Sequence, residues 1–147
     1  MSIFVIADLH LSFKNPKPMD IFGDNWTKHE EKIKKDWNEK VKEEDLVVLP
    51  GDFSWATYIE DTIPDFEYLN SLPGKKIMLK GNHDYWWTTV TSMRKFLKEN
   101  KFQNKQCDHT PWKNQIRHII RTHTTRTIRP EPYRFEKLIV KRMESSR

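Results

Sequence analysis

Three short polar motifs in the first 84 residues carry side chains that can bind metal ions or move a proton. The motifs are D-x-H, G-D and G-N-H-D, in that order along the chain. Their candidate residues are Asp8, His10, Asp52, Asn82, His83 and Asp84. A carboxylate together with an imidazole suits zinc, manganese or iron better than calcium or magnesium. If the fold brings the motifs together, they predict a transition-metal site.

Four of these residues have the atoms that a pair of metal ions requires. Asp8 and His10 lie two residues apart, so both side chains can turn toward one ion. Asp52 can bridge two ions with its two oxygens, and Asn82 offers a neutral oxygen to the second ion. Two ions about 3.5–4 Å apart can clamp a phosphate and generate the hydroxide that attacks it. The predicted cofactor is therefore two divalent ions, with manganese, iron or zinc favoured.

The third motif also contains a pair of residues suited to proton transfer. His83 can stay off the metals and handle a proton, with Asp84 fixing its tautomer. Gly51 and Gly81 precede the second and third groups of candidate residues. Because glycine has no side chain, we expect the backbone at these two positions to come close to an ion or an anion.

Short apolar runs precede all three motifs, and helical patterns lie between and after the runs. The runs predict strands at Ile3–Ala7, Leu46–Leu49 and Lys76–Lys80. Apolar residues at helical spacing predict helices over about 27–43, 63–69 and 88–99. Thr27 and Glu30 match a capping box at the start of the first helix. This alternation predicts an α/β fold whose parallel strands end at one edge, where ligand sites gather.

With these three motifs, the sequence resembles the calcineurin-like metallophosphoesterases. The resemblance rests on the three motifs in order and covers about residues 2–100. It includes Ser54-Trp55 after the second motif and Tyr85-Trp86-Trp87 after the third. The aromatic extension is similar to a bacterial branch of the family whose members mostly lack a defined substrate.

The resemblance implies a β-sandwich flanked by helices and a dinuclear metal centre that hydrolyses a phosphomonoester or phosphodiester. The substrate would be a small phosphoester or a nucleotide. By motif, the implied metal ligands are Asp8, His10, Asp52 and Asn82. His83 would protonate the leaving oxygen or steady the transition state, with Asp84 behind it.

The chain departs from the family after about residue 100. The family has a later histidine and a terminal G-H-x-H motif, whereas this chain has no glycine after Gly81. The late histidines His109, His118 and His123 do not match that motif. We therefore expect the N-terminal βαβαβα half in residues 1–100 and a truncated or divergent C-terminal half. Our hypothesis is that residues 101–147 are not the native continuation, which would leave the site incomplete and the chain inactive.

The charge distribution leaves a second class of function open. Residues 1–100 contain 14 basic and 17 acidic residues, whereas residues 101–147 contain 12 and 4. A basic tail can bind nucleic acid or another polyanion, and the candidate contacts are Arg117, Arg121, Arg126, Arg129 and Arg134. Aromatic residues are sparse there and no binding motif is present, so nucleic acid is the less favoured partner. A non-catalytic metal-binding protein is the other alternative.

The remaining features favour ordinary structural roles. No apolar run approaches the ~20 residues of a membrane helix, and a single cysteine, Cys107, fits a reducing cytoplasmic setting. Large aromatic residues after a strand pack more often than they bind substrate, so we favour packing for Trp55 and for Tyr85-Trp86-Trp87, with a ring at the mouth of the site as the less favoured alternative. We expect His29 on the surface. No feature of the sequence indicates the oligomeric state.

Overall fold

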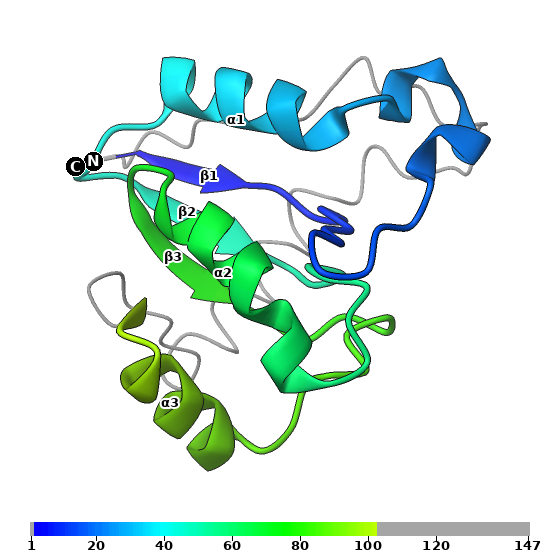
Figure 1. Ribbon diagram of the computed structural model, residues 1–147. Coiled ribbons are helices and arrows are strands. Elements are labelled where there is room, and N and C mark those ends of the chain that lie inside the picture. The colour runs from blue at the N-terminus through cyan, green and yellow to red at the C-terminus, as the bar shows by residue number, and fades with distance from the viewer. Residues whose placement is uncertain (1, 103–147) are drawn as a thin grey trace.

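A parallel three-stranded sheet lies at the centre of the structure (Figure 1). The computed structural model describes residues 2–102. The strands are β1 (Ile3–Val5), β2 (Leu46–Leu49) and β3 (Lys75–Met78), in the order β1-β2-β3. Both neighbouring pairs are parallel, with Phe4 opposite Val47 and Val48 opposite Ile77. The α/β prediction and the parallel direction of the strands are thus confirmed.

Three α-helices follow the strands in the predicted order. They are α1 (His29–Lys40), α2 (Ile63–Asn70) and α3 (Val90–Glu99). Between residues 2 and 102 there are also three 3-10 helices: η1 (Met19–Phe22) and η2 (Asp24–Trp26) lie between β1 and α1, and η3 (Ile59–Thr62) lies between β2 and α2. Among the residues described, no helix is long and apolar enough to cross a membrane.

The predicted capping box at the start of α1 is wrong. The N–H of Thr27 donates to the carbonyl of Asp24, so Thr27 closes the short η2 turn. The N-cap is Lys28, which has left-handed backbone angles and makes no capping hydrogen bond through its side chain. A local 3-10 turn has therefore taken the residue that the helix pattern assigned to the cap.

The two faces of the sheet contribute to two separate apolar clusters. The larger cluster joins one face to all three helices and contains Phe4, Val47, Met78, Ile33, Trp37, Phe66, Leu69, Met93 and Leu97. The smaller cluster is formed by the strand residues that alternate with those of the larger one. It consists of Val48 and Ile77, with Ile3, Val5, Leu46 and Leu79 packed against them. Since strand side chains alternate between faces, both faces of this sheet are apolar.

Beyond the strands, the chain segments that carry the motifs stay side by side. The backbone N–H of Asp8 donates to the carbonyl of Gly51 over 3.2 Å, and that of His10 donates to the carbonyl of Asp52 over 3.0 Å. The segment after β1 therefore runs along the segment after β2 and brings the first two motifs to the same edge. This confirms the convergence expected from parallel strands.

The two motif glycines pack against the neighbouring segment. A Cβ added to Gly51, whose φ is 138°, would overlap the Cα and N atoms of Gly81. A Cβ added to Gly81 would overlap the carboxylate and backbone N of Asp52. We expected these glycines to make room for an ion or anion, whereas the contact made here joins the ends of β2 and β3.

Several predictions fall outside the part of the chain that the structure describes. They concern the basic arginines, the late histidines and the hypothesis about residues 101–147, apart from Lys101 and Phe102, which are described. The division at residue 100 and the basic-tail alternative remain predictions.

Replacing Gly51 by alanine should destabilise the fold more than the same change at Gly23. Both positions have positive φ, 138° and 122°, but an added Cβ at Gly23 meets nothing within 4 Å. The backbone penalty is shared, so the difference reports the overlap with Gly81. We expect Gly51→Ala to cost about 1–3 kcal/mol more than Gly23→Ala in urea unfolding. Equal losses would contradict the close approach of these two segments.

Candidate metal centre

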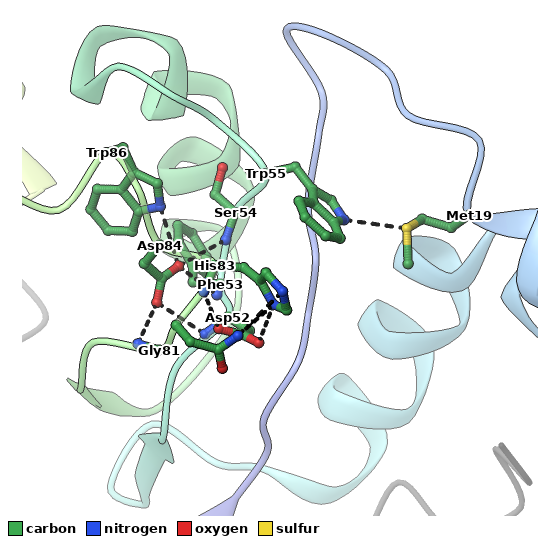
Figure 2. Close-up of polar contacts among 10 residues, drawn as sticks. Met19, Asp52, Phe53, Ser54, Trp55, Gly81, His83, Asp84 and Trp86 are labelled. Atoms are coloured by element: carbon green, nitrogen blue, oxygen red, sulfur yellow. Dashed lines mark hydrogen bonds and ion pairs between the residues drawn. The ribbon is translucent and has the colours of Figure 1, made fainter. Parts of the chain in front are cut away.

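Three predicted site residues come together at the carboxyl edge of the sheet. His10, Asp52 and His83 each offer a possible ligand atom, and these atoms lie within 4.8 Å of one another. The Nδ1 atom of His83 lies 2.8 Å from Oδ2 of Asp52, and the backbone N–H of His83 donates to Oδ1 over 2.9 Å (Figure 2). Asp52 therefore holds both the ring and the backbone of His83.

His10 supplies the clearest sign that this group suits a cation. Its Nδ1 atom is buried and has no hydrogen-bond partner among residues 2–102. Burial lowers the pKa of the ring, although the nearby charge of Asp52 acts in the opposite direction. A neutral imidazole with a free nitrogen is the form that binds metals. A buried ring nitrogen without a partner, in a histidine that offers a possible ligand atom within 4.8 Å of one from Asp52, fits a metal ligand.

Asp52 is the anionic member of the group. Its burial opposes ionisation, but hydrogen bonds from the amide and ring of His83, with the charges of His83 and His10, lower the pKa overall. The carboxylate is therefore ionised at neutral pH. Each carboxylate oxygen has more than one lone pair, so Asp52 can accept these hydrogen bonds and also coordinate an ion.

Three candidate ligands share an unusual backbone conformation. Asp8, His10 and Asp52 have φ values of 58°, 46° and 52°, and they are three of the five non-glycine residues with positive φ between residues 2 and 102. Asp and His enter this region more readily than most residues, but it is still unfavourable. Such strain clusters at functional sites, because the surrounding structure must hold it in place.

Asp8 and Asn82 lie next to this group without being part of it. Asp8 is exposed, yet partial desolvation and then the charge of Asp52 raise the pKa of its carboxyl. Asn82 is also exposed, and its Nδ2 atom lies 3.2 Å from both ring nitrogens of His83. Both residues lie at the edge of this group, where their oxygens would extend the set of ligands to a second ion.

Asp84 contacts backbone amides. Its carboxylate is fully buried and accepts hydrogen bonds from the amides of Asp52 and Phe53 over 2.9 Å each, and from that of Gly81 over 2.7 Å (Figure 2). The amide of Ser54 and the indole N–H of Trp86 complete the set of donors. The position that we assigned to Asp84, against the ring of His83, is taken by Asp52.

The aromatic residues divide between the core and the metal centre. Trp86 is 1% exposed and Trp87 packs against the same core, which confirms the packing prediction for both. Tyr85 is 66% exposed, so packing is wrong for this ring, which lies 6.3 Å from that of His83. Trp55 is half-buried and stacks on His10, with ring centroids 4.7 Å apart.

His29 is the clearest error in the sequence-based assignment of surface residues. It is 8% exposed, and its Nε2 atom lies 3.0 Å from the carbonyl oxygen of Leu9. For Trp55 the less favoured alternative, a ring beside the candidate ligands, is the one that the structure supports. Its position directly after the second motif was the available signal, whereas nothing in the sequence pointed to His29.

Comparison with known proteins gives one family match. A family model described as calcineurin-like phosphoesterase matches residues 1–141, which extends beyond the region of the three motifs. Among solved structures, a protein of unknown function from Aquifex aeolicus is 24% identical, with a TM-score of 0.44. The alignment covers 65% of this chain and 47% of the solved one, so this chain spans about half of its length. A comparison with curated proteins found no match.

Replacing Asp84 by asparagine should destabilise the protein and loosen the metal centre. One end of the side chain would become an NH2 group facing amide donors, which costs about 1–3 kcal/mol for each amide left without an acceptor. Asp65 provides a matched control, because it is equally buried and accepts from the Phe13 amide and the Ser54 hydroxyl. A hydroxyl can reverse its role and accept, so Asp65→Asn should cost less. Similar melting temperatures for the two variants would contradict this role of Asp84.

Proposed function

The chain belongs to the calcineurin-like phosphoesterase family, and on this premise we propose that it hydrolyses small phosphoesters at a metal centre formed by His10, Asp52 and their neighbours. The observation that carries the proposal is that His10, within residues 2–102, has a buried, unpartnered Nδ1 and offers a possible ligand atom within 4.8 Å of one from the ionised Asp52. A family that acts on phosphoesters and a donor set that suits a transition metal point to the same chemistry.

The proposed metal ligands are those of the three motifs. Asp8, His10 and Asp52 would hold one ion, and Asp52 with Asn82 would hold a second. Bound ions would stabilise charge on the phosphoryl oxygens and supply a nucleophile at neutral pH. Asp52 contributes a fixed negative charge, while the neutral ring of His10 contributes a lone pair without needing to lose a proton.

His83 is the proposed proton donor. Since the carboxylate of Asp52 can only accept, the contact at Nδ1 favours a proton on that nitrogen. In the imidazolium form a second proton, carried on Nε2, would pass to the leaving oxygen of the ester, and the neutral ring would keep its proton on Nδ1. The same ring belongs to the group of three possible ligands, so metal binding and proton transfer must be separated by experiment.

A cleft beside the metal centre is the proposed site for the organic part of the substrate. Its volume is about 290 Å³, near the lower end of the usual range for ligand pockets. The lining includes Lys17 and Met19, which also contact Trp55: the Lys17 ammonium lies 4.5 Å from the ring centroid, and the Met19 sulfur accepts from the indole N–H over 3.3 Å. Trp55 in turn stacks on His10, so the cleft adjoins the candidate ligands.

The second ion and the sandwich architecture are also part of this proposal. The cluster around Val48 and Ile77 gives the sheet an apolar second face, as a sheet in a sandwich requires. The described residues contain a single sheet, so a second sheet and any further ligands would lie outside residues 2–102.

Asp52→Asn and His83→Ala should separate metal binding from proton transfer. Asp52→Asn removes an anionic ligand, so we expect it to weaken Mn²⁺ binding and to slow hydrolysis of phenyl phosphate, each by about 100-fold or more. His83→Ala should keep Mn²⁺ affinity and lose about 100-fold or more in rate. Titration calorimetry and phosphate release are the measurements. Hydrolysis by Asp52→Asn at the wild-type rate would refute the proposed function.

A change of leaving group tests the role of His83 further. Nitrophenolate is a stable anion and needs little protonation, whereas phenolate needs more. His83→Ala should therefore slow the hydrolysis of phenyl phosphate much more than that of 4-nitrophenyl phosphate. Equal losses, together with weaker Mn²⁺ binding, would show that His83 acts as a ligand.

Filling the cleft should affect large substrates selectively. Thr27 lines the cleft and is exposed, so Thr27→Trp should raise KM for naphthyl phosphate and leave KM for methyl phosphate close to that of the wild type. Thr91, exposed on α3, provides the control Thr91→Trp. If both variants have wild-type KM values for both esters, the cleft is not the substrate site.

A further inference from the structure

A buried histidine outside the three motifs holds the backbone between two candidate ligands. His29 is the first residue of α1, and its Nε2 atom lies 3.0 Å from the carbonyl oxygen of Leu9. A carbonyl oxygen can only accept, so the ring must donate from Nε2. Leu9 lies between Asp8 and His10, so this hydrogen bond holds a backbone carbonyl inside the D-x-H motif.

The D-x-H segment needs such support because its conformation is unfavourable. Asp8 and His10 both have left-handed φ angles. Their amides are held by the carbonyls of Gly51 and Asp52, and the side chain of Leu9 is 1% exposed in the core. Those contacts hold the N–H side and the side chain, while the hydrogen bond from His29 holds the carbonyl that lies between the two strained residues.

The ring of His29 is itself held in one orientation. The ring of Trp26 meets it edge to face, with centroids 5.3 Å apart and planes at 67°. Its Nδ1 atom lies 3.1 Å from a carboxylate oxygen of Glu30. Contacts at both nitrogens and on the ring leave little freedom to the imidazole, so the hydrogen bond to Leu9 has a defined direction.

We propose that His29 is a positioning residue that sets the geometry of Asp8 and His10 for metal binding, without touching the ion. This inference rests on the proposed function, because it assumes that the D-x-H motif binds metal. It also makes a separate claim about the backbone: without the His29 donor, the segment should relax away from its left-handed angles. That claim can be tested in the absence of any metal.

Trp37 offers a control on the same helix. Its indole N–H donates to the carbonyl of Pro73 over 3.0 Å, so it also joins α1 to a backbone carbonyl, but away from the motifs. Trp37→Phe and His29→Phe each keep a flat ring and remove one such donor. His29→Gln keeps an N–H near the position of Nε2 and serves as the conservative variant.

The first measurement is Mn²⁺ affinity of the full chain by titration calorimetry. We expect His29→Phe to bind Mn²⁺ about tenfold or more weakly than the wild type, a loss typical of outer-shell partners. Trp37→Phe should bind as the wild type does, although both variants lose some stability. His29→Gln should recover most of the affinity. Equal affinities for His29→Phe and Trp37→Phe would overturn the proposal.

The second measurement is amide hydrogen exchange without metal, read by NMR. The amide of His10, which donates to Asp52, should exchange faster in His29→Phe than in Trp37→Phe, relative to amides of the β2 strand. If the wild type binds no Mn²⁺, the metal-centre proposal fails, and exchange at His10 alone then decides the positioning role. Unchanged protection of His10 in His29→Phe would refute it.

Discussion

The carboxylate of Asp84 is the interaction on which the arrangement of the site depends. It is fully buried and accepts from amides at the ends of two different strands, those of Asp52 and Phe53 after β2 and that of Gly81 after β3. Hydrogen bonds to an ionised acceptor are about twice as strong as neutral ones, and their loss leaves buried amides without partners. Asp52 is held by Asp84, and His83 is held by Asp52. The geometry of the centre thus follows from one buried charge, and the bare glycine backbone at 51 and 81 allows the segments to come close enough.

Most of the fold could be predicted from the sequence because it depends on burial. The spacing of Ile33 and Trp37, of Phe66 and Leu69, and of Met93 and Leu97 predicted the three helices, and these side chains are buried in one core. The start of α1 was not predictable in the same way. Thr27 and Glu30 have the residue types of a capping box, but the 3-10 turn at Asp24–Trp26 competes for the same backbone and forms instead.

The site was predictable in its residue types and only partly in its contacts. The motifs identified His10, Asp52 and His83, which lie together, because parallel strands end at one edge. They did not show that Asp84 binds backbone, or that His29 binds the carbonyl of Leu9. Backbone amides and carbonyls do not depend on the residue type. A side chain that binds the backbone therefore requires no particular residue at the contacted position, and the sequence gives no sign of the contact. For Trp55 packing was favoured over a place at the site for another reason, since a large ring near a strand end packs in either case.

The preference of Asp84 for main-chain donors has a consequence for how this centre evolves. Pairs of residues that contact through side chains tend to change together, and such covariation is what alignments reveal as contact. Phe53 and Ser54 offer Asp84 only their amides, so substitutions at these positions leave the hydrogen bonds in place and require no compensating change in the acid. The residue with the most connections in this site should therefore show no covariation with them. Its importance would appear only as invariance.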